Sequence, residues 1–333
     1  MEPIAVDAMG GDHAPSAIVA GARQAAEELG IPVVLVGRPD EIDAAGGPGD
    51  LEVIPASEVI AMDADAGSSV RRMKDSSLVR AAEAVRDGRA SAMVSAGNTG
   101  ATMASALFRM GRIKGVARPA IATPIPVPGA PSPTILLDAG ANAECQPEWL
   151  VQFAQMGAVY SRLRYGVECP RVGLLSIGEE PAKGNPLVKA TYPLLDEGEW
   201  AEAADAEFAG NVEGRDLMNG AADVVVTDGF TGNVALKTLE GGMRSLVSAL
   251  LGAFDADDAT RAASEVLLPA LSPLYAQLDP ENTGGAMLLG VDGVCIISHG
   301  SSSAKAIVNA CRVAAEMVEA DVVGALRVAV AAG

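Results

Sequence analysis

The sequence predicts an α/β protein with a doubly wound, mostly parallel sheet in a three-layer α/β/α arrangement. Short apolar runs of strand length alternate along the 333 residues with segments of helical periodicity. Hydrophobic residues make up 49% of the chain but aromatic residues only 3%, which favours the small aliphatic interior of parallel strands covered on both faces. No compositional linker divides the chain, so we expect a single catalytic domain over residues 1–333.

In the first half, apolar runs mark the strands and a 3.6-residue period marks the helices. Strands are expected at residues 4–11, 33–37, 51–56, 91–97, 120–127, 134–140 and 171–178. Helices are expected from Pro15 to Leu29, over residues 78–86, from Thr99 onward, and over residues 148–163. Strands that alternate with helices in this way form parallel β-α-β units.

The second half repeats this alternation, with one exception. Strand-to-loop units at 206–214 and 222–230 precede a long helix, and a final strand at 293–300 precedes the last helix. The exception is the apolar segment at about 253–290, where Pro269, Pro273 and Pro280 argue against one uninterrupted helix. We expect this segment to protrude and to form a dimer contact, a reversible contact with a membrane surface, or both.

Charge and cysteine usage restrict the possible partners and compartment. A formal net charge of −19 argues against nucleic acid, whose phosphates need clustered Lys and Arg, and against docking on an anionic membrane by charge alone. The four cysteines form no C-x-x-C pair and are interpreted as reduced packing residues. With no positively charged leader and no apolar run of roughly 20 residues, we expect a cytoplasmic protein.

The pair Gly-Asn recurs where expected strands end, and this recurrence is the main functional signal. It occurs at Gly97-Asn98, Gly184-Asn185, Gly210-Asn211 and Gly232-Asn233, with the related "DAGAN" ending at Asn142. Glycine allows close backbone approach to a ligand, and a following helix offers free N–H groups to an anion. One such pair would be an ordinary turn, but several at successive strand ends predict a shared crevice for a phosphate-like group.

Other well-defined chemistries lack their motifs. The sequence contains no G-x-x-x-x-G-K-[ST], no G-x-G-x-x-G after the first strand and no G-x-S-x-G. His13 and His299 are the only histidines, too few for a His-rich zinc site, and we predict no metal site.

Seven motifs, in order along nearly the whole chain, resemble the bacterial phosphate acyltransferases of phospholipid synthesis, the PlsX family. They are "DAMGGDHAP", "SAGNTGA", "LLDAGAN", "IGEEPAKGN", "GNVEGRD", "DGFTGNVALK" and "HGSSSAKAI". In the last motif Ser303 stands where many relatives have Asp. The resemblance implies a phosphotransacetylase-like fold and transfer of a long fatty acyl group from acyl carrier protein to inorganic phosphate. It also implies a homodimer, peripheral membrane association, and a downstream membrane acyltransferase that uses the acyl phosphate.

The residues suit such a reaction. Phosphate is partly dianionic at neutral pH and attacks a thioester without a strong base, so the enzyme mainly has to hold an anion and stabilise an oxyanion. We therefore expect no metal or redox cofactor. Catalytic candidates are Lys183, His13, Asn233 and Lys237. Candidates for binding phosphate or substrate are Asp7, Gly10, Gly11, Gly97, Asn98, Thr99, Gly100, Asn142, Asn185, Asn211, Thr231, Gly232, His299, Gly300 and Ser301.

Several of these assignments have plain alternatives. Lys183 and Lys237 are equally typical of surface lysines, and His13 of a turn-capping side chain. Arg71, Arg72 and Lys74 are the strongest basic cluster and our candidate docking patch for the acidic carrier protein, unless they are only a solvated loop. Two other functions stay open: a related enzyme on the same sheet, such as a short-chain phosphotransacetylase or a metal-dependent dehydrogenase, and a non-catalytic lipid-surface protein.

Overall fold

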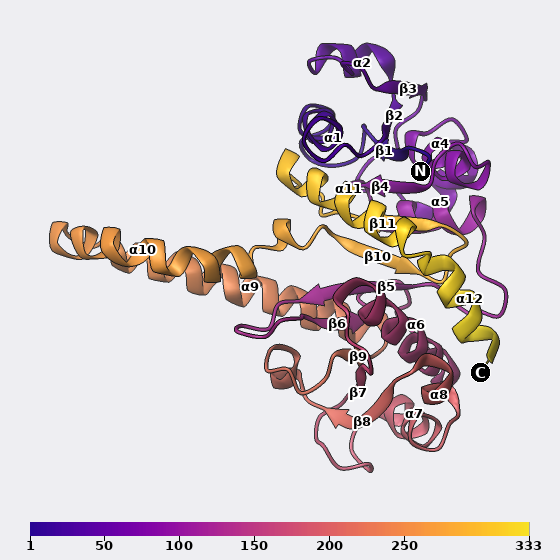
Figure 1. Cartoon of the computed structure of the whole chain (residues 1–333), viewed down its shortest axis with the longest axis vertical. Helices are drawn as coiled ribbons and strands as arrows, with labels where there is room; N and C mark the ends of the chain where they lie inside the picture. The colour runs from indigo at the N-terminus through magenta and orange to yellow at the C-terminus, as the bar shows by residue number, and fades with distance from the viewer. Residues whose placement is uncertain (333) are drawn as a thin grey trace.

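The computed structural model describes residues 1–332 and contains one eleven-stranded sheet between two layers of helices (Figure 1). In sheet order the strands are β3 (Glu52–Pro55), β2 (Val33–Gly37), β1 (Ile4–Asp7), β4 (Ala92–Ser95), β11 (Val294–Ile297), β10 (Ala286–Leu289), β5 (Ala120–Ile125), β6 (Thr134–Leu137), β9 (Val224–Val226), β7 (Arg171–Leu175) and β8 (Glu207–Val212). The central strands are buried along their whole length, as expected for a sheet covered on both faces.

Two hydrophobic cores lie on the two faces of this sheet. One face is covered by α1 (Ser16–Leu29), α2 (Pro39–Ala44), α6 (Pro147–Tyr165), α7 (Pro186–Asp196), α8 (Trp200–Ala204), α11 (Ala304–Glu319) and α12 (Val322–Ala332). The other face is covered by α3 (Ala66–Arg72), α4 (Ser77–Arg86), α5 (Thr99–Arg109), the 3-10 turn η1 (Gly214–Met218) and the first turns of α9 (Gly229–Phe254). The three-layer, doubly wound prediction is confirmed.

The strand directions change in the middle of the sheet. β10 is antiparallel to both of its neighbours, and β5 is antiparallel to β6, so the strands from β6 to β8 run opposite to those around β1. Adjacent strands also rotate by about 20–25° each, which adds up to roughly 100° between β4 and β9. This reversal and twist let strand ends from both halves approach one region on the face covered by α5 and α9.

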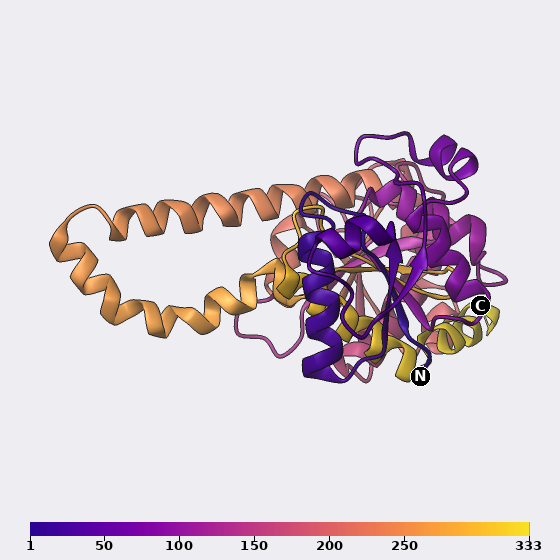
Figure 2. The same cartoon turned by 90° about the horizontal axis from the view of Figure 1, so that it is seen from above.

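The segment at 253–290 agrees with its prediction in outline and differs from it at two prolines. α9 and α10 (Asp258–Leu278) form a helical hairpin that projects from the body, and η2 (Pro280–Asn282) then leads into β10 (Figures 1 and 2). The segment is not one helix, as expected, but Pro269 and Pro273 do not break α10. Both prolines are exposed, so the carbonyl groups that they leave without an N–H partner are accessible to water, and the helix bends along its length (Figure 2).

Among residues 1–332, no helix combines the length and the apolar character needed to cross a bilayer. The helices α2, α3, α7, α8 and α12 and the strand β10 were not predicted from the sequence.

Candidate functional site

A cavity of about 650 Å³ lies where the two halves of the sheet meet, at the base of the α9–α10 hairpin. One part of its wall is polar and includes Asp12, Gly97, Thr99, Asn233, Lys237, Ser298, His299, Gly300, Ser301 and Ser302. Another part is apolar and includes Ile121, Ile125, Leu236, Leu239, Met243, Val247, Leu278 and Ile297. A few convergent polar groups beside a long apolar wall are typical of a site for a lipid-like substrate.

The end of β4 reaches the cavity through a turn held by a buried carboxylate. Asp7, at the end of β1, accepts a hydrogen bond from the Ser95 hydroxyl (2.7 Å), and Ser95 Oγ accepts one from the Gly97 N–H (3.0 Å). Burial raises the pKa of Asp7, and its hydrogen bonds with Ser77 and Ser95 oppose this rise. At Gly10 an added Cβ would lie 2.5 Å from Asp7 Oδ2, so only glycine fits beside this carboxylate.

After β11, His299 is held by its neighbours in a defined tautomer. Its Nδ1 lies 3.2 Å from the Ser301 backbone nitrogen and 2.8 Å from Ser301 Oγ. Because a backbone N–H can only donate, Nδ1 is the acceptor, and the neutral ring carries its proton on Nε2. His299 therefore supplies an N–H donor at the wall of the cavity.

Ser298 is a hydroxyl that the sequence did not single out. The residue is only 5% exposed and lines the cavity, and its Oγ has no hydrogen-bond partner among the described residues. A buried hydroxyl without a partner costs free energy unless a ligand supplies one. Its position at the end of β11, directly before His299, was the signal that could have identified it.

The half of the sheet around β6 and β9 contributes the start of α9, which packs against another buried carboxylate. Asp138 accepts five hydrogen bonds, from the N–H groups of Ile121, Gly140, Ala141 and Asn142 and from the Asn142 amide. Burial raises the pKa of Asp138, against the effect of these bonds. An added Cβ at Gly232 would lie 2.0 Å from the Asp138 carbonyl oxygen, so glycine allows α9 to approach this turn.

Two predicted catalytic residues on α9 line the cavity. Asn233 lines the cavity, and its side-chain amide donates to the Ala139 carbonyl oxygen (3.1 Å). Lys237 is paired with Glu240 on the same helix (2.8 Å), so its charge is already partly balanced. Arg244, about two turns further along α9 than Lys237, also lines the cavity and forms no ion pair within residues 1–332. We did not predict Arg244, because a single arginine on an amphipathic helix is usually a solvated one.

Seven of the predicted site residues line the cavity: Gly97, Thr99, Gly300, Ser301, His299, Asn233 and Lys237. The other predicted asparagines satisfy backbone groups instead. Asn98 caps α5 and donates to the Met62 and Ala64 carbonyl oxygens, while Asn185 caps α7. Some of the recurring Gly-Asn motifs therefore line the cavity, and the others hold the turns at the ends of strands.

The remaining predicted residues lie outside the cavity wall. They are Asp7, Gly10, Gly11, His13, Gly100, Asn142, Lys183, Asn185, Asn211, Thr231 and Gly232, together with Asn98, Arg71, Arg72 and Lys74. The Thr231 N–H and hydroxyl donate hydrogen bonds to the capping residue Asp228, and the Asn211 amide donates to the Glu180 carbonyl oxygen. His13 and Lys183 are exposed, and their predicted catalytic roles stay predictions. Ser303 caps α11 with its hydroxyl, a role that Asp would also fulfil.

No cluster of three or more His, Cys, Asp or Glu side chains within residues 1–332 is arranged to hold a metal ion. The cysteines are free, and burial raises the pKa of Cys145, Cys295 and Cys311 to about 12. These thiols stay protonated at neutral pH and are poor nucleophiles.

The fold is shared with phosphotransacetylases and with a putative dehydrogenase. A phosphotransacetylase from Staphylococcus aureus superposes with a TM-score of 0.61 at 15% identity, covering 95% of this chain and 94% of that one. A putative 4-hydroxythreonine-4-phosphate dehydrogenase from Salmonella typhimurium gives a TM-score of 0.54 at 15% identity, covering 95% and 99%. At this identity the likeness shows the fold alone, and it confirms the phosphotransacetylase-like architecture.

Comparison of sequences identifies the family, which the likeness in fold does not. The chain matches the family described as "Fatty acid synthesis protein" over residues 3–325. It is 48% identical over 330 residues to a phosphate acyltransferase from Heliobacterium modesticaldum, covering 97% of this chain and 96% of the relative. It is 49% identical over 320 residues to one from Pelotomaculum thermopropionicum, covering 95% and 91%. The chain therefore belongs to the phosphate acyltransferases, a family of enzymes in fatty acid and lipid synthesis.

Proposed function

We propose that this phosphate acyltransferase moves a long-chain acyl group from the thiol of acyl carrier protein to inorganic phosphate. The product is an acyl phosphate, which a downstream membrane acyltransferase uses to acylate glycerol phosphate. The observation that carries this proposal is the cavity itself, because hydroxyl, imidazole and amide groups at one end adjoin an aliphatic wall along α9 and α10. A short acyl group would leave most of that apolar wall in contact with water.

The reaction needs hydrogen-bond donors for the developing oxyanion and a site that positions phosphate beside the thioester. A phosphate oxygen forms the new bond to the thioester carbonyl carbon, the C–S bond breaks, and the carrier thiolate leaves and takes up a proton. The Ser298 hydroxyl and the His299 Nε2–H are the donors best suited to the carbonyl oxygen as its charge develops. Thr99 and Ser301 add hydroxyls for the phosphate, and no covalent acyl-enzyme is formed.

The acyl chain lies along α9 and α10. Leu236, Leu239, Met243 and Val247 follow one another at helical spacing on the cavity side of α9, and Leu278 faces them from α10. Removing this much aliphatic surface from water favours a long chain, at about 0.8 kcal/mol for each buried methylene.

The projecting part of the hairpin serves two further contacts. Large apolar side chains are exposed along both helices, including Leu246, Leu250, Leu251, Val266 and Leu267. An exposed apolar surface of this kind supports a homodimer contact and a transient contact with a membrane surface, which brings the product close to its membrane acceptor enzyme.

Chain-length preference tests where the acyl group binds. Replacing Leu239 and Met243 with Trp fills the apolar end, so kcat/KM for a 16-carbon acyl thioester should fall at least tenfold relative to that for a short one. Matched Trp substitutions at Leu29 and Leu194, which are exposed and lie outside both the cavity wall and the hairpin, should leave the ratio unchanged. An unchanged ratio in the Leu239/Met243 variant would place the acyl chain elsewhere. Turnover of acetyl-CoA alone would favour the phosphotransacetylase alternative, which the shared fold keeps open.

A further inference from the structure

The region around α3, α4 and α5 is strongly basic although the chain as a whole is acidic. Between Arg71 and Lys114 lie nine of the 24 Lys and Arg residues but only three of the 43 Asp and Glu residues. α3 and α4 both pack against α5, so these three helices together form one part of the molecular surface. A local excess of six positive charges in a chain of net charge −19 marks this surface as a place where a negatively charged partner would approach.

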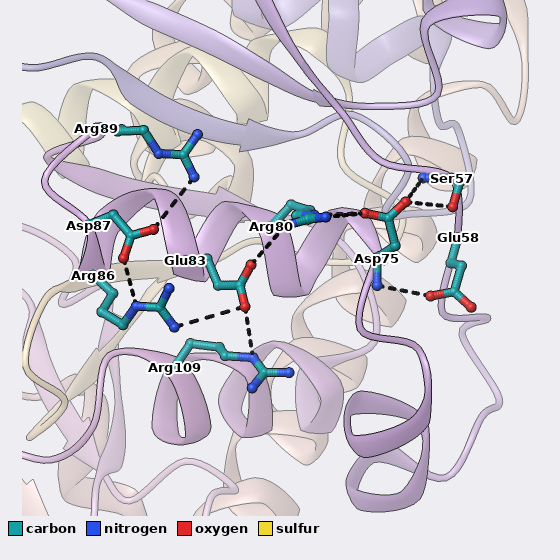
Figure 3. Close-up of polar contacts among 9 residues, drawn as sticks. All are labelled: Ser57, Glu58, Asp75, Arg80, Glu83, Arg86, Asp87, Arg89 and Arg109. Carbon is teal, nitrogen blue, oxygen red and sulfur yellow. Dashed lines mark hydrogen bonds and ion pairs between the residues drawn. The ribbon is translucent and has the colours of Figure 1, made fainter.

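The three carboxylates of this region are already engaged (Figure 3). Glu83 lies within ion-pair distance of Arg80, Arg86 and Arg109, at 3.3, 3.9 and 3.5 Å. Asp87 pairs with Arg86 and Arg89, and Asp75 pairs with Arg80. The arginines of α4 and the end of α5 therefore neutralise the local acids and hold the two helices together.

The remaining charge is concentrated at the end of α3. Arg71, Arg72 and Lys74 are exposed and form no ion pair within the described part of the chain. Arg72 donates hydrogen bonds to Ser68, one turn earlier on the same helix, and both arginines interact at longer range with the carboxylate of the α3 cap, Asp65. These three cations are available to a partner, unlike those shown in Figure 3.

An exposed aromatic ring lies beside these cations. The Arg71 guanidinium stacks over Phe108 at 5.4 Å from the ring centroid, and Phe108 is 45% exposed. Arginine and aromatic side chains, Phe among them, are enriched in protein interfaces relative to the rest of the surface. A purely solvated loop has no need of an exposed phenyl ring, so this pair favours contact with a protein over a diffuse ion atmosphere.

The same elements lead from this surface to the cavity. Met62 and Thr99 line the cavity, and the Asn98 amide ties the Met62 carbonyl to the start of α5 (2.8 Å). α3 begins at Ala66, four residues beyond Met62 and directly after its cap Asp65. Along α5, Phe108 is nine residues from Thr99, which corresponds to roughly 14 Å. A partner seated on the end of α3 is thus one short helix away from the cavity.

We propose that Arg71, Arg72, Lys74 and Phe108 form the docking surface for a small acidic protein that presents the acyl thioester on a flexible arm. The arm reaches the cavity past Met62 and Thr99. This proposal rests on the proposed function and specifies how its carrier-bound substrate is recognised. The three cations accelerate association by charge, and Phe108 supplies an apolar contact at the centre.

The test compares a carrier-bound substrate with a small one. The variant R71E/R72E/K74E should lower the ratio of kcat/KM for acyl carrier protein thioester over kcat/KM for acyl N-acetylcysteamine at least tenfold at low salt. F108S should also lower this ratio of kcat/KM values. The matched control R23E/K189E/R327E changes the same net charge on helices of the opposite layer and should keep the wild-type ratio. Thermal melts establish that each variant is folded.

A direct binding measurement tests the docking surface independently of the transfer reaction. Anisotropy of labelled acyl carrier protein should show binding to the wild type that weakens with added salt and at least tenfold in the triple variant. Binding without any turnover would refute the transfer reaction and leave the docking surface in place. An unchanged ratio and unchanged affinity would overturn the docking surface. Loss of binding to anionic phospholipid vesicles, with carrier binding retained, would also overturn it.

Discussion

At the scale of single residues, the site contains buried polar groups that form hydrogen bonds and one buried hydroxyl that forms none. The two buried carboxylates, Asp7 and Asp138, accept hydrogen bonds from the turns that border the cavity, so their role is to fix the backbone. The Ser298 hydroxyl has no such partner and lines the cavity. The structure thus separates the carboxylates whose hydrogen bonds build the turns from a buried hydroxyl that is left without a hydrogen bond.

Replacing Ser298 with Ala tests this separation. Loss of an oxyanion donor should reduce kcat by about 10²-fold, as for single donors in other acyl-transfer sites. The melting temperature should change little, because the hydroxyl forms no hydrogen bond in the free protein. The matched control is Ser161→Ala on α6, another buried hydroxyl without a partner but far from the cavity wall, which should keep wild-type activity. Wild-type kcat in Ser298→Ala would remove this residue from the mechanism.

The sequence predicted residue types better than residue roles. Of the residues it singled out, His299, Ser301 and Asn233 line the cavity, because the motifs that contain them follow strands directly. It did not distinguish these from Asn98 and Asn185, since a helix cap and a ligand contact both place Asn between a strand and a helix. Only the three-dimensional direction of the side chain decides between the two roles.

At the scale of elements, one pair of loops is held by a single carboxylate (Figure 3). Asp75 accepts hydrogen bonds from the Ser57 N–H (3.0 Å), the Ser57 hydroxyl (2.6 Å) and Arg80 (2.7 Å). These contacts lower the pKa of Asp75 to about 2. The stabilisation is complete above the unfolded pKa of about 4 and is lost as the pH falls towards 2.

Asp75→Asn should therefore be less stable than the wild type at pH 7, and the difference should shrink between pH 4 and pH 2. Because the side chain is 38% exposed, we expect a difference of only about 1 kcal/mol at neutral pH. Urea unfolding at several pH values measures it, with Asp63→Asn as a control, since Asp63 is exposed and forms no side-chain hydrogen bond within residues 1–332. A difference that grows on acidification would contradict this account.

The α9–α10 hairpin is the element whose function depends most on a second molecule. Leu246 and Val266 are 71% and 78% exposed, and burying them requires a partner surface. Replacing both with Glu should convert the proposed dimer into a monomer in size-exclusion chromatography with light scattering. Adding the same charge at the exposed polar positions Ser245 and Ser248 should preserve the dimer. If the Leu246/Val266 variant keeps the mass of a dimer, the hairpin is not the dimer contact.

The elements also show where prediction from sequence stops. The long strands and helices were found because each has an unambiguous period. β10 was missed because its four residues, Ala286–Leu289, are antiparallel and lie inside a segment whose apolar residues suggested an exposed contact. α10 passes through two prolines because it is exposed to water, which propensity alone does not reveal.

At the scale of the whole molecule, the fold brings two half-sites together. The half of the sheet around β1, β4 and β11 supplies Gly97, Thr99 and His299, and the half around β6 and β9 supplies Asn233 and the first turns of α9. β10 and β5 lie between them, and the reversal of direction at these strands, together with the sheet twist, forms one cavity. The sequence predicted a layered sheet and the family, but the reversal depends on a strand order that no local pattern encodes.

The central claim is that the long acyl group passes from acyl carrier protein to phosphate, and one measurement tests it most directly. Purified protein is mixed with palmitoyl carrier protein, with and without inorganic phosphate, and free thiol and acyl phosphate are followed by thiol titration and mass spectrometry. We predict thiol release only with phosphate and one acyl phosphate for each thiol. Thiol release without phosphate, or no release from the carrier protein at all, would contradict the claim.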